Sequence, residues 1–213
     1  SRLVMRETLI ERGGGAGVHI EGAEAVIEDT VIRDMVRATD GVKLGIPPQG
    51  YGIVVAQELT RGLSVEASLT LRSSVIARTW GAGLRLFGAK AVVEHTTIDA
   101  TASFASGPCY GHGVRVIGDS VHPAQLTMTS STIANSEGAG LHVLGGNAIV
   151  NRSLIRATTA SACGGVWGDG VAVLSQPQAS AQGAQPASVR LQDSFVRDSV
   201  RAGAALFHGA LTL

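Results

Sequence analysis

The chain has 213 residues, which is enough for one domain with a sizeable hydrophobic core. Lysine plus arginine (17) balance aspartate plus glutamate (17), so no net charge favours nucleic acid or an anionic membrane as a partner. No apolar run approaches the roughly 18 residues of a membrane-spanning helix.

A repeat runs through the chain, and its clearest copy is Gln125 to Gly146, QLTMTSSTIANSEGAGLHVLGG. The copy opens on an alternating segment with an aliphatic column. This column is Met5, Ile27, Leu71, Val93, Met128, Val150, Leu191 and Leu213. Three residues on comes a hydroxyl column, formed by Thr8, Thr30, Ser74, Thr96, Ser131, Ser153 and Ser194. Two further on comes a β-branched column, formed by Ile10, Ile32, Ile76, Ile98, Ile133, Ile155 and Val196.

Each copy then reaches a glycine pair that opens an apolar strand. These motifs are GAGVHI, GYGIVV, GAGLRL, GHGVRV, GAGLHV and GDGVAV, with Ala202-Gly203-Ala204 as a degenerate seventh copy. Segments of period two with many glycines and few aromatics favour short strands over helices. Strands one coil apart must pair in parallel, and three strands per coil, bent at glycines that tolerate positive φ, wind into a solenoid.

Short and long coils alternate along the chain. Bare coils of 22 residues run from Met5 to Ile27, Leu71 to Val93, Met128 to Val150 and Leu191 to Leu213. The longer intervals carry insertions around 35–49, 100–110 and 157–167, and around 56–67, 119–124 and 175–187. The sequence therefore predicts a single domain over residues 1–213 with about seven coils. Because the chain starts and stops inside strand patterns, we expect a piece of a longer repeat protein.

The coil length, the S/T-x-I step and the G-x-G strand resemble right-handed parallel β-helix proteins of the pectin-lyase-like superfamily. The resemblance covers the whole chain and implies an all-β, right-handed parallel β-helix, in agreement with the usual handedness of parallel crossovers. A leucine-rich horseshoe fits poorly, because the spacing L-x-x-L-x-L is missing. The family includes polysaccharide lyases, hydrolases, epimerases, adhesins and phage tailspikes, so the fold does not state the function.

One motif tests the enzymatic members of that superfamily. The sequence GHG at Gly111 to Gly113 is similar to a motif of polygalacturonases, but the N-T-D and D-D motifs that precede it in those enzymes are absent, and GDG at Gly168 to Gly170 comes after it. His112 is therefore expected to be a surface loop residue. Calcium-dependent lyases need clustered carboxylates, and no acidic cluster beside an Arg or Lys stands out.

The two cysteines, Cys109 and Cys163, fall in corresponding loops two coils apart. Three interpretations are open: a disulfide that joins the loops, free thiols, or a metal site that includes His112. The metal site is the weakest of these, because Cys109-x-x-His112 lacks a second paired ligand motif. The sequence therefore predicts no metal and no cofactor.

The most informative positions flank the glycine pairs. The position before the pair holds Gly14, Gln49, Trp80, Tyr110, Glu137, Trp167 and Arg201. The position between the glycines holds Ala16, Tyr51, Ala82, His112, Ala139, Asp169 and Gly203. The outward column of the next strand contains His19, Arg85, Arg115 and His142. All of these should lie on one side of the solenoid, below the projecting loops.

Aromatic faces beside arginines and carboxylates are what a sugar site uses. The candidate groove consists of Trp80, Tyr110, Trp167, His112, Asp169, Tyr51, Glu137, Arg85 and Arg115. The alternative is that the aromatic residues anchor the long loops to the wall of the solenoid.

Two outward columns are unusually apolar for solvated strands. One is Val4, Val26, Thr70, Val92, Thr127, Ile149, Arg190 and Thr212; the other is Leu9, Val31, Val75, Thr97, Thr132, Leu154 and Phe195. They predict a cover: missing regions of the protein, a neighbouring subunit or a surface. The T-x-T ladders are too irregular for an ice-binding solenoid. Beside the first column, Arg6, Glu28, Arg72 and Glu94 predict a ladder of charge pairs that sets the register of the coils.

The sequence therefore predicts a non-enzymatic extracellular or cell-surface module that recognises carbohydrate or assembles with partners. A polysaccharide-active enzyme (lyase, hydrolase or epimerase) is the alternative. An enzyme should show acids and bases clustered in a groove with perturbed ionisation, whereas a binding module should show dispersed polar residues.

Overall fold

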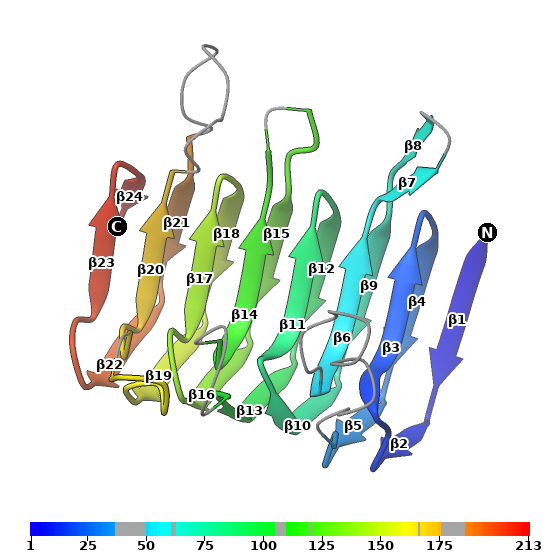
Figure 1. Cartoon of the computed structure of the whole chain (residues 1–213), viewed down its shortest axis with the longest axis horizontal. Coiled ribbons are helices and arrows are strands. Elements are labelled where there is room, and N and C mark those ends of the chain that lie inside the picture. Colours follow the sequence, from blue (N-terminus) through cyan, green and yellow to red (C-terminus); the bar gives the residue numbers. More distant parts are fainter. Residues whose placement is uncertain (37–49, 61–62, 105–109, 120, 166, 176–185) are drawn as a thin grey trace.

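The computed structural model describes residues 1–36, 50–60, 63–104, 110–119, 121–165, 167–175 and 186–213. Coils of parallel strands stack side by side from the N-terminal to the C-terminal end, with three faces per coil (Figure 1). Within these residues, no helix is long and apolar enough to cross a membrane. The chain is a parallel β-helix.

The first face is one parallel sheet of eight strands. In spatial order these are β1 (Arg2–Arg6), β4 (Glu24–Glu28), β9 (Ser68–Arg72), β12 (Lys90–Glu94), β15 (Gln125–Thr129), β18 (Asn147–Asn151), β21 (Ser188–Gln192) and β24 (Ala210–Thr212). Its registers align Ile27 with Leu71 and Val93 with Met128, as the aliphatic column predicts.

The second and third faces are parallel ladders joined by one antiparallel pair, Trp80 with Gly50. The second face holds β2 (Leu9–Glu11), β5 (Val31–Arg33), β10 (Val75–Trp80), β13 (Thr97–Ala102), β16 (Thr132–Ser136), β19 (Leu154–Thr158) and β22 (Phe195–Ser199). The third face holds β3 (Gly15–Glu21), β6 (Gly50–Ala56), β11 (Ala82–Phe87), β14 (His112–Ile117), β17 (Leu141–Leu144), β20 (Val171–Leu174) and β23 (Ala204–Phe207). A hairpin of β7 (Glu58–Thr60) and β8 (Leu63–Val65) projects from the coils.

The second glycine of each G-x-G motif is required because a side chain at that position would clash with the core. A Cβ on Gly113 would lie 2.2 Å from the γ2 methyl of Ile133, and one on Gly83 would lie 2.4 Å from that of Ile98. The same contact joins the β-branched column to the second glycine of every motif from GAGVHI to GDGVAV. The β-branched column and the glycine pair are therefore two halves of one packing contact across the core.

The corners correct the expectation that every bend uses glycine. The first corner places a non-glycine residue at φ 46–51° in each coil. These residues are Glu7, Asp29, Ser73, His95, Ser130, Arg152 and Asp193. The second corner does the same at φ 51–59°, at Arg12, Asp34, Arg78, Ala100, Asn135, Ala157 and Asp198. Glycine serves the third corner at Gly22, Gly88 and Gly145, where His208 replaces it in the last coil, and it also takes positive φ at the entry to the third face, at Gly15, Gly81 and Gly168.

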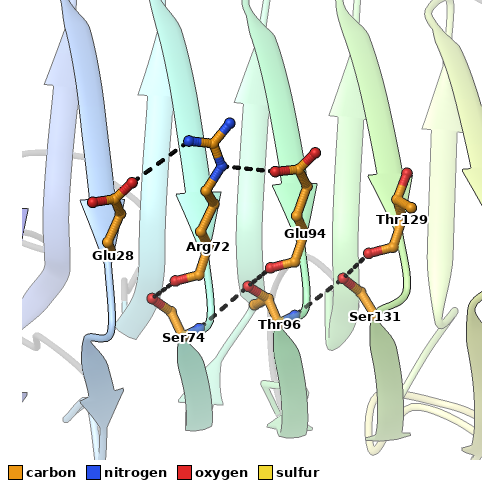
Figure 2. Close-up of polar contacts among 7 residues, drawn as sticks. All are labelled: Glu28, Arg72, Ser74, Glu94, Thr96, Thr129 and Ser131. Atoms are coloured by element: carbon orange, nitrogen blue, oxygen red, sulfur yellow. Dashed lines mark hydrogen bonds and ion pairs between the residues drawn. The ribbon is translucent and has the colours of Figure 1, made fainter.

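The hydroxyl column explains how the first corner tolerates a left-handed residue, a conformation that costs on the order of 1 kcal/mol outside glycine. The Ser74 hydroxyl donates to the Arg72 carbonyl at 2.7 Å and so spans Ser73, while the Thr96 hydroxyl does the same to Glu94 at 2.9 Å. From Ser74 to Ser194, each hydroxyl of the column also accepts the backbone N–H of the hydroxyl residue one coil earlier, as Figure 2 shows for Thr96 and Ser131. The ladder of hydroxyl groups therefore links neighbouring coils and also supplies hydrogen bonds at the first corner.

The predicted charge ladder is confirmed. Arg6 Nε donates to Glu28 at 2.8 Å, and Arg72 lies between Glu28 (3.5 Å) and Glu94 (2.7 Å) (Figure 2). Both predicted outward columns also align in register, and Val4, Ile149 and Phe195 are exposed to 52%, 42% and 72%.

Candidate functional site

A trough opens on the outer face of three neighbouring strands, β3, β6 and β11. Two outward columns cross them, His19–Val54–Arg85 and Glu21–Ala56–Phe87. The middle strand contributes the small side chains of Val54 and Ala56, while its neighbours contribute long ones. The result is a cavity of about 280 Å³ that Tyr51 also lines. Its walls stand two strand spacings apart, roughly 10 Å.

The two walls differ in chemistry. On β3, His19 Nε2 lies 3.8 Å from Glu21 Oε2, and both side chains are 56% exposed. On β11, Arg85 donates to the Tyr51 hydroxyl at 3.1 Å, and its guanidinium lies 5.3 Å from the centre of the Tyr51 ring. Because Tyr51 is buried, it fixes the position of Arg85. Arg85 Nε is itself buried and has no hydrogen-bond partner in the described structure.

A packed aromatic cluster lies next to the trough. The rings of Trp80 and Phe104 stack with centroids 6.2 Å apart and planes 15° from parallel. Gly81, at φ 79°, lies where a Cβ would come within 2.7 Å of the Tyr51 ring and 3.0 Å of the Phe104 ring. Trp80 thus holds the start of the 100–110 insertion against the wall. Gln49, at the equivalent position one coil earlier, lies outside the described residues.

Farther along the third face, three rings form what we call the histidine patch: His112, His142 and Trp167. His112 and His142 stack with centroids 4.5 Å apart, and Trp167 meets both edge-on, at 5.5 and 5.0 Å. The prediction of His112 as a surface loop residue is wrong: it lies on β14, is 0% exposed, and its Nδ1 accepts the Ala139 N–H at 3.0 Å. The reason is that Trp167 and its loop cover the outward face here.

Burial governs the ionisation of the patch. Loss of water, helped by the charge of Arg115, lowers the pKa of His142 to about 3. The same desolvation, together with His142 and Arg115, holds the pKa of His112 well below 6.5. His112 Nε2 and both ring nitrogens of His142 are buried without a hydrogen-bond partner among the described residues. The two imidazoles are therefore neutral at pH 7 and closed to solvent.

The remaining residues of the predicted groove are also engaged in contacts with other residues of the protein. The guanidinium of Arg115, only 7% exposed, lies 3.9 Å from the centre of the Tyr110 ring, and burial lowers its pKa. Asp169 is fully buried and accepts a bidentate pair from Arg201, with Nε to Oδ1 at 2.8 Å. Glu137 accepts from the Ser103 N–H at 3.0 Å and the Ser103 hydroxyl at 3.1 Å.

Cys163 is disulfide-bonded, while the chain's other cysteine, Cys109, lies outside the described residues. A disulfide sulfur is not a thiolate, so Cys163 does not serve the metal alternative.

The structure thus divides the predicted groove. Tyr51 and Arg85 reach the open trough, whereas Tyr110, His112, Arg115, Trp167 and Asp169 are engaged in contacts with one another or with Arg201. Sequence reasoning missed Glu21, Val54, Ala56 and Phe87 as lining residues. Their signal was present: both outward columns carry a small residue on the middle coil between two longer ones.

The coils and the outer trough define this molecule as a parallel β-helix with a candidate site on a strand face. The chain belongs to the right-handed β-helix region family, whose model matches residues 1–155. This confirms the predicted right-handed parallel β-helix.

Comparison with solved structures gives two matches at low sequence identity. A crystal structure of the periplasmic alginate epimerase AlgG matches over 98% of this chain with 7% identity and a TM-score of 0.44, and this chain spans 46% of that one. A structure of trypsin-treated QnrB1, a plasmid-mediated fluoroquinolone resistance protein, matches over 99% of this chain and 92% of its own, with 11% identity and a TM-score of 0.23. No curated protein matches the sequence.

Proposed function

We propose that the protein is a non-enzymatic, extracellular or cell-surface module that recognises carbohydrate in the trough of β3, β6 and β11. The observation that carries the proposal is the lining of the trough. It combines apolar side chains, the aromatic rings of Tyr51 and Phe87, a guanidinium and a carboxylate within one cavity. The disulfide at Cys163 supports the location, because disulfides persist in oxidising compartments.

The trough suits one sugar ring. Its volume of about 280 Å³ lies just below the range typical of drug-sized ligands. The apolar face of a ring packs on Phe87, Val54 and Ala56, while hydroxyl groups reach Arg85 and Glu21 at the rim. Arg85 is already positioned by Tyr51, so binding a hydroxyl costs little further ordering.

The described acids and bases argue against catalysis. His112 and His142 are sealed under Trp167, and Asp169 and Glu137 are engaged by other residues. In the trough, His19 and Glu21 are more than half exposed, whereas catalytic acids and bases usually sit in desolvated sites. Recognition without turnover is the function that this arrangement supports.

The test is a glycan array scored for both binding and cleavage, followed by titration of any hit. Ala56→Phe should fill the trough and abolish binding. Ala205→Phe is the matched control, since Ala205 is also an outward alanine on the third face, paired with Ala172 at the C-terminal end. Binding that survives Ala56→Phe would place the ligand elsewhere, and a cleaved glycan would favour the enzymatic alternative.

Assembly is a second proposed role, and the exposed outward columns favour it. Val4, Leu9 and Phe195 are each more than half exposed on strand faces. Light scattering should show self-association that Phe195→Ser weakens. A monomer at all concentrations would contradict this role and leave the trough proposal intact.

A further inference from the structure

The trough has three different surfaces within the span of one sugar ring. Its floor is the methyl groups of Val54 and Ala56, continued by the Phe87 ring. One wall ends in the Arg85 guanidinium, whose buried Nε lacks a hydrogen-bond partner in the described structure. The opposite wall ends in the Glu21 carboxylate, diagonal to Arg85 because the two belong to different outward columns. A ligand that fits must offer an apolar group, an acceptor and a donor together.

We infer that the trough selects a sugar with an N-acetylated amino group; this rests on the proposed carbohydrate-binding function. An acetamido group carries the three matching features on four heavy atoms. Its methyl packs on Val54 and Ala56, its carbonyl oxygen accepts from Arg85, and its N–H donates to Glu21. A hydroxyl in the same place has no methyl for the floor and cannot span both walls.

Charge separates this ligand from other sugars. The trough carries one positive and one negative side chain, Arg85 and Glu21. A sugar carboxylate drawn to Arg85 would also meet Glu21, and a free amino sugar drawn to Glu21 would meet Arg85. Like charges at close range disfavour both of these ligands. The neutral acetamido group satisfies each wall without repulsion.

The size of the preference follows from the groups involved. Burial of one methyl group contributes about four-fold in affinity, and one additional net hydrogen bond contributes a further factor of about five. The N-acetylated sugar should therefore bind about twenty-fold more tightly than the same sugar with a hydroxyl.

The experiment compares four trisaccharides by calorimetric titration of the whole chain: N-acetylglucosamine, glucosamine, glucose and galacturonate oligomers. The N-acetylated trisaccharide should bind most tightly. Glu21→Gln should weaken it several-fold and raise the relative affinity of the galacturonate trisaccharide, because the repelling carboxylate is gone. Ala56→Phe should abolish binding, and Ala205→Phe should leave it unchanged. Thermal melting of each variant shows that it is folded.

Failure of the acetamido selection and failure of the carbohydrate-binding function give different results. If the glucose trisaccharide binds as tightly as the N-acetylated one, selection of the acetamido group is wrong while carbohydrate recognition stands. If none of the four binds and the glycan array is also empty, the carbohydrate-binding function itself is overturned. An unchanged preference in Glu21→Gln would also overturn the role given to the Glu21 wall.

Discussion

The trough and the histidine patch occupy the same face of the same solenoid, yet one is open and the other is sealed. One outward column runs through both regions, in register from strand to strand. It contains Arg85 in the trough, Arg115 beside the patch and His142 within the patch. In the trough, the middle strand offers Val54 and Ala56 and the face stays hollow. Around the patch, Tyr110 and Trp167 cover the column, so Arg115 and His142 are buried.

The difference teaches that a repeat position does not have a fixed role. An outward position lines an open trough where its neighbours one coil away are small. It becomes an internal position where a long loop returns an aromatic side chain over it. The imidazoles of the patch are buried, and burial lowers their pKa values, whereas Arg85 and Glu21 line an open cavity.

The largest effect should come from the core beneath the patch. Ile133→Ala should lower the free energy of unfolding by about 2–5 kcal/mol, because Ile133 is fully buried and its γ2 methyl fills the space over Gly113. Thr132→Ala, one residue away and outward, should cost much less. Denaturant midpoints measure both, and hydrogen exchange should show β14 opening before β6. Equal losses for the two variants would contradict the packing described.

Acidification should weaken the protein through the patch. The pKa of His142 is lower in the folded chain, about 3, than its ordinary 6.5, so the unfolded chain takes up more protons below pH 6.5. Stability is therefore full above that pH and falls as the pH falls, by about 2–3 kcal/mol for His142 between pH 6.5 and 4.5. The lowered pKa of His112 acts in the same direction.

The measurement is urea unfolding at pH 7.0 and 4.5, with His142→Leu as the control. This variant keeps an apolar side chain under Trp167 and removes one titrating group, so its stability should depend less on pH. An equally steep pH dependence in His142→Leu would show that the patch is not the acid-sensitive element.

Trp167→Ala should separate anchoring from ligand binding in the patch. Its edge-on contacts with His112 and His142 contribute about 0.5–1.5 kcal/mol beyond area burial. If Trp167 anchors the 157–167 loop, thermal stability falls, the pKa of His142 rises toward its ordinary value, and glycan affinity is unchanged. If the aromatic column of Trp80, Tyr110 and Trp167 binds sugar, affinity falls while the solenoid stays folded. Melting, NMR titration of the histidines and glycan titration decide between the two.

The smallest effect should come from the charge ladder, which touches neither region. Arg72→Ala removes contacts with Glu28 and Glu94 (Figure 2), but these ion pairs are partly exposed and therefore screened by solvent and salt. The denaturation midpoint should barely move, and ligand affinity should not change. A large loss at low salt that disappears at high salt would show that the ladder stabilises the coils more than its exposure suggests.

The sequence by itself determined the coils. The aliphatic, hydroxyl and β-branched columns and the second glycine of each motif recur at fixed offsets, and the registers align them as read. These positions can be predicted from the sequence because each makes its contacts with a repeat position one coil away. The sequence prediction was wrong at the first corner. Glycine was expected there, but the hydroxyl ladder permits left-handed residues such as Ser73 and His95.

Only the tertiary structure decided which outward positions are open. His112 was expected at the surface and is buried, because Trp167, 55 residues later in the chain, lies across it. Asp169 was expected in a groove and is held by Arg201 from the next coil. The columns did show a small residue, Ala56, between Glu21 and Phe87, but they did not show that the face above it stays uncovered. Exposure of this kind depends on the size and path of residues far apart in the chain, and a column of equivalent positions does not encode it.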